Sequence, residues 1–361
     1  LSSRFDEGVR QMTVVLFMLG YGLVTIPSVL YSGSIAVLKL FDVPELLQLG
    51  YSASLLLTIV LIGALGAAYA ILGGLRAVAV SDTLNGVGLL IVGVAVPWLG
   101  LQALGEGSVG AGLNILLTTE THKLNAIGGP SDPTPFATLF TGMVFANLFY
   151  WCTNQYVIQR TLAARSLAEG QKGVLLSGFF KVLVPLLMMI PGVVAYHLYG
   201  PELQSIDLAY PQLVRDVFPV YATGFFLAVL LGAVLSSFNS LINSASTLFC
   251  IDVYQPWVSR PVSDAELVRV AKRVGLIITV FSLMVAPLLQ FAEEGLWQVI
   301  RIFTGFYNIP MIAIVIVGLF TRHVPAVGAK AVIVFHIVAY GAFQFLFKEL
   351  LPVHFFHLYP I

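Results

Sequence analysis

Residues 221–254 read YATGFFLAVLLGAVLSSFNSLINSASTLFCIDVY. No charged side chain interrupts this stretch before Asp252, and a helix needs only about 20 mostly apolar residues to cross a bilayer. Its second half nevertheless carries serine and asparagine side chains, which hydrocarbon does not solvate. The stretch therefore predicts a membrane-spanning helix with a polar face turned toward other parts of the protein.

Apolar runs of this kind recur along the chain. Of its 361 residues 58% are hydrophobic and 10% charged, whereas soluble domains carry roughly 25% charged residues. We predict an all-α polytopic membrane protein with one transmembrane domain over residues 1–361 and nine spans, at about 10–41, 47–73, 77–103, 135–159, 172–199, 221–254, 266–290, 296–320 and 326–350. The tail from Pro352 to Ile361 looks like the entrance to another span. The chain begins at Leu1 without an initiator Met or a signal peptide, which predicts a fragment.

Lysine and arginine indicate the side of the membrane on which each loop lies, because cytoplasmic loops retain them. A cytoplasmic N-terminus gives consistent alternation across all nine spans. The residues then predicted on the cytoplasmic side are Arg4, Arg10, Arg76, Arg160, Arg165, Lys172, Arg260, Arg269, Lys272, Arg273, Arg322 and Lys330, and those outside are Lys39, Lys123, Arg215 and Lys348.

Two basic residues, Lys181 and Arg301, fall inside predicted spans. A charge at the bilayer centre costs at least about 2.5–3.5 kcal/mol, so such a residue normally faces a wet cavity or a partner. We expect a functional role for both. The alternative is an interhelical ion pair or a side chain that snorkels to the interface.

Two spans carry polar stripes. In the fourth, amide and aromatic groups recur at i, i+3, i+4 and i+7, at Asn147, Tyr150, Trp151 and Asn154. This stripe suits a neutral polyhydroxylated solute, because amides bond hydroxyls and aromatic rings stack on sugars. The alternative is interhelical packing with aromatic residues at the interface.

In the sixth span the stripe consists of Ser236, Ser240, Asn243 and Thr247. The adjacent hydroxyls of Ser236 and Ser237, with the carbonyl of Ala233, supply hard oxygen ligands for part of a Na⁺ site. Close helix packing through small residues is the alternative.

Asp82 opens the third predicted span, near the cytoplasmic face. Such a carboxylate is either a helix cap or a way-station for a cation at the inner mouth of a pathway, and the residues alone favour the cap. Enzyme signatures are missing from the sequence, including H-E-x-x-H, a phosphate loop, C-x-x-C and a close pair of intramembrane carboxylates. Eighteen basic residues balance eighteen acidic ones, which gives no reason to expect a nucleic-acid partner.

Several strings resemble one family. They are Y-W-C-T-N-Q-Y-V-I-Q-R-T-L-A-A-R-S-L-A-E-G-Q-K-G at 150–173, F-F-K-V-L-V-P at 179–185, P-G-V-V-A-Y-H-L-Y at 191–199, G-G-L-R-A-V-A-V-S-D at 73–82 and the second half of the stretch quoted first. Together they resemble the sodium/solute symporter family, and within it bacterial sodium/sugar cotransporters of the glucose/galactose type. The strings at 127–133 and 301–310 look most like a poorly characterised bacterial branch.

The resemblance implies a LeuT-like core of two five-helix inverted repeats, with the substrate at the midplane and Na⁺ as coupling ion. It implies no organic cofactor, a multi-pass protein of the bacterial inner membrane, and a chain that lacks the first core helices and is truncated at both ends. By resemblance Asn147 is a sugar-binding amide, Tyr150 an inner-gate tyrosine and Lys181 a sugar-contacting lysine. In the same way Ala233, Ser236 and Ser237 form the sodium site, and Asp82 lies on the sodium exit route.

One position departs from the sugar transporters. Where they carry a glutamine that bonds the sugar, this sequence has Arg301, whose permanent charge and fork of donors suit a carboxylate or phosphate. Arg301 thus raises the hypothesis of an acidic or otherwise altered monosaccharide. We expect a sodium-coupled symporter, not an enzyme, that imports a sugar or sugar-like solute by alternating access, with Na⁺, the bilayer and a monosaccharide as partners. The alternatives are a symporter for a carboxylate, vitamin or amino acid, or a channel or sensor without coupled transport.

Overall fold

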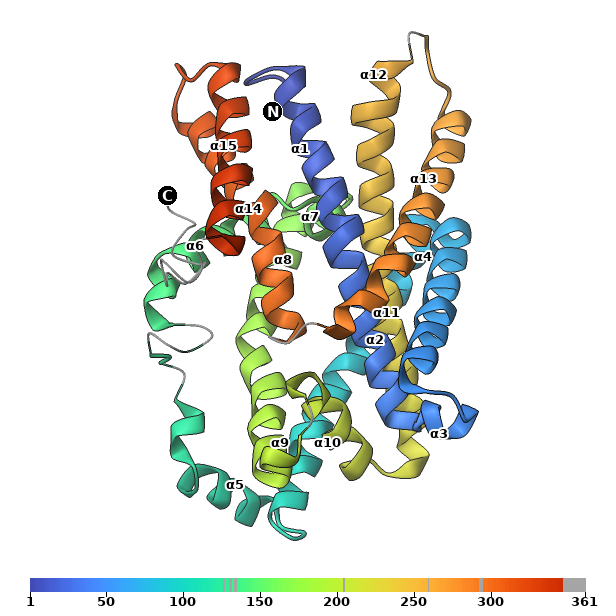
Figure 1. The fold of residues 1–361 in the computed structure, drawn as a ribbon, viewed down its shortest axis with the longest axis vertical. Coiled ribbons are helices and arrows are strands. Elements are labelled where there is room, and N and C mark those ends of the chain that lie inside the picture. The colour runs from blue at the N-terminus through green and yellow to red at the C-terminus, as the bar shows by residue number, and fades with distance from the viewer. Residues whose placement is uncertain are drawn as a thin grey trace.

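The computed structural model describes residues 1–346 apart from 126, 130, 131, 133, 134, 204, 259 and 292–294, with the backbone alone at 71–78 and 201. Within this part of the chain every element is helical (Figure 1). Eight helical segments are long and apolar enough to cross a membrane, namely Glu7–Phe41, Tyr51–Ala70, Ala79–Leu104, Leu167–Tyr199, Val220–Trp257, Asp264–Phe291, Leu296–Phe320 and Ala326–Phe345. Eight of the nine predicted spans are thereby confirmed, and the chain is a multi-pass membrane protein.

Three of these spans contain a π-helical turn just before a proline. Their elements are α1 (Glu7–Gly20), η1 (Tyr21–Thr25) and α2 (Ile26–Phe41), then α8 (Leu167–Val184), η4 (Pro185–Met189) and α9 (Ile190–Tyr199), and then α11 (Val220–Phe249), η7 (Cys250–Tyr254) and α12 (Gln255–Trp257). In each, the second residue after the turn is a proline, Pro27, Pro191 or Pro256. Proline has no N–H to continue the α-helical ladder. The wider turn accommodates this loss, as where the Ile26 N–H bonds the Tyr21 carbonyl.

The second and third spans lie in one helix, α4 (Tyr51–Leu104), of 54 residues. Gly66 packs against Phe238 and Gly88 against Val229, so both contacts fall on α11. The two α11 residues are about 13 Å apart along their helix, whereas a straight α4 would separate the two glycines by about 33 Å. The helix therefore changes direction between Gly66 and Gly88, and Figure 1 shows its blue first part and cyan second part running in different directions. The two halves act as two spans.

The segment predicted as a span at 135–159 is not one continuous helix. This region forms a 3₁₀ turn, η3 (Phe136–Phe140), and two short helices, α6 (Gly142–Cys152) and α7 (Gln155–Leu162). The N–H groups of Thr153 and Asn154 both bond the Phe149 carbonyl, and the Thr153 hydroxyl donates to it as well, which ends α6. The main-chain oxygen of Asn154 then accepts the first bonds of α7. Asn154 consequently leaves the helical face that carries Asn147, Tyr150 and Trp151.

The remaining elements are α3 (Val43–Leu47), α5 (Val109–Thr118), η2 (Thr121–Leu124), η5 (Gly200–Glu202), η6 (Ile206–Leu208), α10 (Ala209–Val217), α13 (Asp264–Val285), η8 (Ala286–Phe291), α14 (Leu296–Phe320) and α15 (Ala326–Phe345). The last predicted span extends to 350, but the described helix ends at Phe345. The tail from Pro352 to Ile361 lies outside the described residues.

Ion pairs join the helix ends on one side of the bundle, at the top of Figure 1. Lys330 of α15 bonds Asp6 at 2.6 Å, and this bond together with the Val9 N–H holds the pKa of the Asp6 carboxyl below its usual range. Arg10 of α1 bonds Asp252 of η7 at 2.7 Å. The helix ends joined by these ion pairs are ends that we predicted, from the distribution of lysine and arginine, to lie on the cytoplasmic side.

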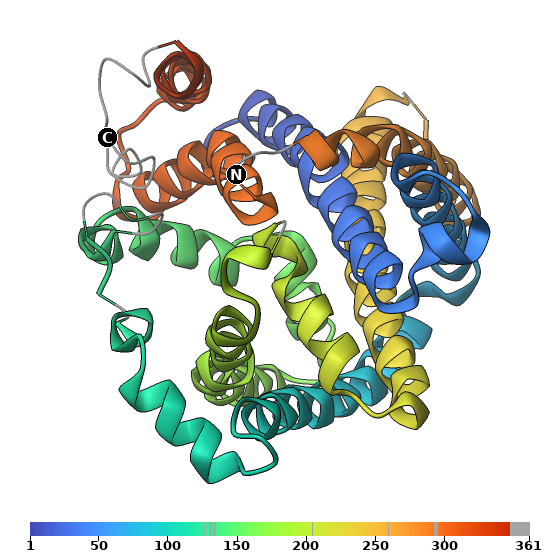
Figure 2. The ribbon, with the colours of Figure 1, turned by 60° about the horizontal axis from the view of Figure 1, so that its bottom comes forward.

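The main core lies where α1, α2, α4, α11, α13 and α14 meet. Small residues let these helices approach closely, as where Gly33 of α2 packs under Val234 and Gly66 of α4 under Phe238. Figure 2 shows the helices as a ring in which α6 and α8 lie opposite the α2–α11 pair. Unlike the core helices, α8 is exposed along almost all of its length within the described chain.

Candidate functional site

The residues predicted for sodium lie where the second half of α4 packs on α11. Gly88 packs on Val229, and Gly232 leaves room for the side chain of Asn85. The side-chain amide of Asn85 bonds α11 through both of its polar atoms. Its nitrogen donates to the Val229 carbonyl and its oxygen accepts from the Ala233 N–H, at 2.9 Å each. This antiparallel register places Asp82, one turn before Asn85, beside Ser236 to Ser240. The structure therefore brings Asp82 and the predicted sodium ligands together.

Asp82 forms an ion pair with Arg160 of α7. Arg160 also donates to the Ser240 hydroxyl at 2.6 Å, and Ser240 in turn donates to the Ser236 carbonyl at 2.7 Å. The second carboxylate oxygen of Asp82 is buried and has no hydrogen-bond partner among the described residues. The cap interpretation of Asp82 is wrong, because α4 begins after Gly50 and continues through this residue. The carboxylate instead faces a cationic side chain between three helices.

The hydroxyls of Ser236 and Ser237 are accessible, since the first residue is half-buried and the second exposed. With the Ala233 carbonyl one turn earlier, they present oxygen atoms within about 6 Å along the helix axis. Such neutral oxygens fit a hard monovalent cation, whereas a site for a transition metal would offer imidazole or thiolate ligands. The donor set is compatible with Na⁺.

Tyr150, the predicted gate, lies at the end of α6. Its hydroxyl accepts a hydrogen bond of 2.8 Å from Tyr156 of α7, and the two rings pack edge to face at 5.9 Å between centroids. The bond crosses the break between α6 and α7, so the orientation of Tyr150 depends on how the two short helices are placed.

The other three predicted substrate residues lie on three different helices. Asn147 is exposed on α6 and donates to the Met143 carbonyl at 2.8 Å. Lys181 of α8 lies over the ring of Trp151, and Arg301 of α14 over the ring of Trp297, each 5.2 Å from the centroid. Both cations thus have an aromatic face as partner, which lowers the cost of placing a charge at membrane depth.

A cavity of about 610 Å³ adjoins Lys181. Trp151, Cys152 and Ser177 are among its lining residues, and the walls come from α6, α7 and α8. This volume accommodates a monosaccharide, and the lining combines an aromatic ring, a hydroxyl and a cation. Among the described residues, the lining does not include Asn147, Tyr150 or Arg301, so the structure does not bring all four predicted substrate residues into one cavity.

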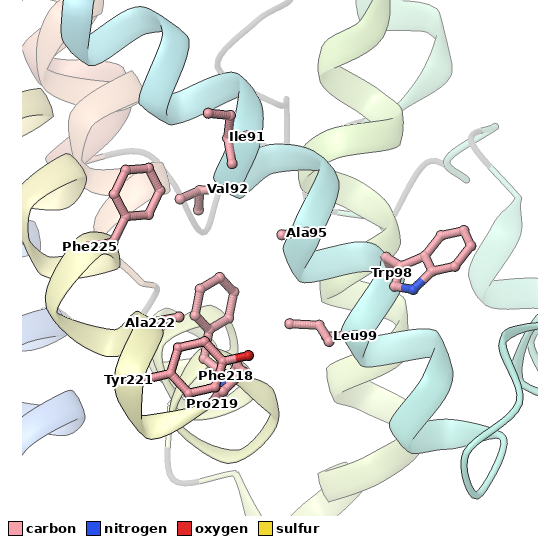
Figure 3. A pocket seen from close by; sticks show the side chains of 10 residues that line it. All are labelled: Ile91, Val92, Ala95, Trp98, Leu99, Phe218, Pro219, Tyr221, Ala222 and Phe225. Carbon is pink, nitrogen blue, oxygen red and sulfur yellow. The ribbon is translucent and has the colours of Figure 1, made fainter.

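A second cavity, of about 330 Å³, lies between α4 and the start of α11 (Figure 3). All ten labelled residues are apolar or aromatic, among them Trp98, Phe218 and Tyr221. It lacks the convergent polar groups that fix the orientation of a sugar. The cavity beside Lys181, by contrast, combines a cation, a hydroxyl and an aromatic ring in its lining.

Sequence reasoning missed the contacts that connect these residues. It assigned Arg160 to a cytoplasmic loop, yet this residue lies in α7 and pairs with Asp82. It also gave no role to Tyr156 or to Tyr21, whose buried hydroxyl donates to Asn154 at 2.8 Å. An available signal was the pair Thr153 and Asn154 followed closely by an arginine, which is unusual inside an apolar span.

Comparisons with known proteins identify relatives of this chain. The chain is 44% identical over 348 residues to an uncharacterised symporter of Escherichia coli K12, YidK, a match that covers 96% of this chain and 61% of the relative. It is 29% identical to the sodium/glucose cotransporter of Vibrio parahaemolyticus, over 91% of this chain and 62% of that protein. The human sodium/myo-inositol cotransporter 2 is 30% identical, with 91% and 52% covered. The chain thus spans about half to three fifths of these relatives.

A solved structure shares the fold. It is the substrate-bound outward-open state of a Na⁺-coupled sialic acid symporter, which superposes with a TM-score of 0.79 over 99% of this chain and 74% of that one, at 20% sequence identity. The helical arrangement is therefore that of a LeuT-like transporter. The model of the sodium:solute symporter family matches residues 1–334, and the chain belongs to that family.

Proposed function

We propose that the full-length protein is a sodium-coupled symporter that imports a sugar or a sugar-like solute by alternating access. The observation that carries the proposal is the break between α6 and α7 within an apolar stretch, with Tyr150 before it and Arg160 after it. Interrupted spans are typical of transporter sites, because the break frees backbone groups and lets the two short helices move separately. The relatives named as sodium/glucose and sodium/myo-inositol cotransporters support a polyhydroxylated solute.

In this mechanism Na⁺ binds the Ala233 carbonyl and the hydroxyls of Ser236 and Ser237. Its higher affinity for the outward-open state shifts the equilibrium toward that state, since a ligand acts only through its differential affinity. The solute then enters the cavity lined by Trp151 and Lys181. Asn147 does not line that cavity in the arrangement seen here, and we propose that it contributes its amide when α6 moves. After inward opening, Tyr150 moves aside and Na⁺ leaves past Asp82, whose charge Arg160 partly neutralises.

The first test is uptake of radiolabelled sugars by the full-length protein in proteoliposomes. We expect accumulation above the external concentration only with an inward Na⁺ gradient. An equal K⁺ gradient, or a Na⁺ gradient collapsed by a sodium ionophore, should abolish accumulation. Flux at the same rate without Na⁺ would indicate a channel and contradict the proposal.

A second test concerns the solute class. Arg301 does not line the cavity beside Lys181 in the arrangement seen here. We propose that it meets the solute in another state of the transport cycle and favours an acidic sugar, because a guanidinium can bind a carboxylate through two hydrogen bonds. The panel should therefore pair neutral sugars with acidic ones, including sialic acid, the solute named for the symporter of similar fold. With Arg301→Gln we expect the KM for the acidic sugar to rise several-fold and that for a neutral sugar to stay unchanged. An unchanged substrate profile would refute this role.

A further inference from the structure

Tyr21 connects two irregular segments that are far apart in the sequence. It is fully buried, it is the first residue of the π-helical turn η1, and its hydroxyl donates to Oδ1 of Asn154 at 2.8 Å. Asn154 is itself only 2% exposed and lies in the break between α6 and α7. The bond thus joins the first span to the interrupted one, across 133 residues of sequence.

The side chain of Asn154 is used in an unusual way. Its main-chain oxygen accepts from the N–H groups of Val157 and Ile158, which makes it the N-cap of α7. An asparagine at this position ordinarily turns its side-chain oxygen onto the first N–H groups of the helix. Here that oxygen makes no capping bond and faces Tyr21 instead. The side chain of Asn154 therefore ties the start of α7 to η1 rather than to the first turn of α7 itself.

Tyr21 also contacts the gate through its ring. The ring lies edge-on to that of Tyr156, at 5.8 Å between centroids and 88° between planes. Tyr156 in turn donates its hydroxyl to Tyr150. Tyr21 therefore has two attachments to the α6–α7 region, one to the break itself and one to the partner of Tyr150.

The position of Tyr21 is set by the π-helical turn. The Ile26 N–H bonds the Tyr21 carbonyl, and Pro27 has no N–H, so the Gly22 carbonyl has no backbone donor at either helical spacing. Ser282 of α13 supplies the missing donor with a buried hydrogen bond of 3.0 Å to that carbonyl. The turn is thus anchored to α13, and it presents Tyr21 toward the break from a fixed point.

We propose that Tyr21 is a positioning residue of the transport site, which holds the break between α6 and α7, and through it Tyr150, in the arrangement seen here. This inference rests on the proposed function in so far as it treats Tyr150 as the gate. Tyr21 need not touch the solute. It acts by favouring one placement of the two short helices, and a bond of this kind must open whenever they move relative to α1.

The test uses Tyr21→Phe, Asn154→Ala and the double variant in the full-length protein. Tyr21→Phe removes one oxygen and keeps the ring against Tyr156. We expect each single variant to raise the KM for the solute and the half-saturating Na⁺ concentration by the same factor, about three- to tenfold, because a smaller fraction of the protein is competent to bind. The double variant should show the same factor as the singles, since all three lack the same bond. A purely structural loss would lower the amount of folded protein and Vmax instead.

A second readout does not depend on transport. Cys152 is exposed and lies two residues before Asn154, whereas Cys250 is buried. The rate of maleimide labelling at Cys152, located by mass spectrometry and with Cys152→Ser as the blank, should change several-fold and equally in the three variants. Tyr254→Phe is the matched control, because it loses a tyrosine hydroxyl bond to Glu266 on another pair of helices and should leave the rate unchanged.

The outcomes separate the two proposals. Additive effects in the double variant, or an unchanged labelling rate with an unchanged KM, would overturn the role of Tyr21. Absence of sodium-dependent uptake in the unmodified protein would overturn the proposed function, and the labelling experiment would still decide whether Tyr21 holds the break. If Tyr21→Phe does not yield folded protein, the comparison of Asn154→Ala with the unmodified protein carries the same prediction.

Discussion

Replacing Arg160 with glutamine should lower the free energy of unfolding of the full-length protein by about 3 kcal/mol. The change leaves the Asp82 carboxylate without its counterion, in a site where the side chain is only 18% exposed and one oxygen already has no described hydrogen-bond partner. Breaking a buried ion pair by removing one partner costs about 3–5 kcal/mol. We expect the lower end of this range because the Arg160 side chain is 34% exposed.

The measurement is thermal unfolding of purified protein in detergent, followed by tryptophan fluorescence. The double variant Asp82→Asn with Arg160→Gln should recover most of the stability, since it leaves no uncompensated charge. Lys172→Gln is the matched control, because its pair with Glu169 is exposed at the surface of α8 and should be worth less than about 1 kcal/mol. If Arg160→Gln unfolds at the same temperature as the unmodified protein, or if the double variant is no more stable than the single one, the ion pair does not stabilise the fold.

The spans could be predicted from the sequence because hydropathy sums side chains, and side chains decide which segments enter lipid. The same property explains why the break inside 135–159 could not be predicted. That run is apolar enough to span, but the hydroxyl of Thr153 and the N–H groups of Thr153 and Asn154 all converge on one carbonyl and end the helix there. A sum over side chains cannot register where a backbone ladder stops.

The π-helical turns, unlike the break at 135–159, are marked in the sequence. Each one is followed at the second residue by proline, so its position was present in the sequence as Pro27, Pro191 and Pro256. A proline in a span, however, predicts only a local disturbance. Whether the ladder widens, kinks or breaks depends on which neighbour satisfies the freed carbonyl, as Ser282 does for Gly22 from a helix about 260 residues later.

Some residues of the candidate site could be predicted from the sequence, whereas the contacts between helices could not. Asn147, Tyr150 and Ser236 follow from stripes along single helices together with the family resemblance. The bonds from Arg160 to Asp82 and from Tyr21 to Asn154 join residues 78 and 133 positions apart. Periodicity within one helix says nothing about which residue of another helix lies opposite. These contacts therefore needed the fold.

Replacing Ser237 with alanine in the full-length protein should raise the half-saturating Na⁺ concentration by at least about tenfold, while the solute KM at saturating Na⁺ changes less than about twofold. Even second-shell partners of a metal ion cost about 10–100-fold in affinity when they are lost, so a hydroxyl that contacts the ion directly should cost at least as much. Because Ser237 is exposed, its removal creates no buried cavity in α11. A specific loss of sodium affinity is therefore separable from a loss of stability.

The assay is initial-rate uptake in proteoliposomes over a range of Na⁺ concentrations at fixed ionic strength, with Ser236→Ala measured in parallel. Ser34→Ala is the matched control, because that hydroxyl bonds the Leu30 carbonyl within its own helix and has no place in the proposed site. Saturating Na⁺ should restore solute binding in Ser237→Ala, since the solute contacts lie on other helices, at Asn147 and Lys181. An equal loss of sodium and solute affinity in Ser237→Ala would instead mean that this residue supports the fold of α11 and does not bind the ion.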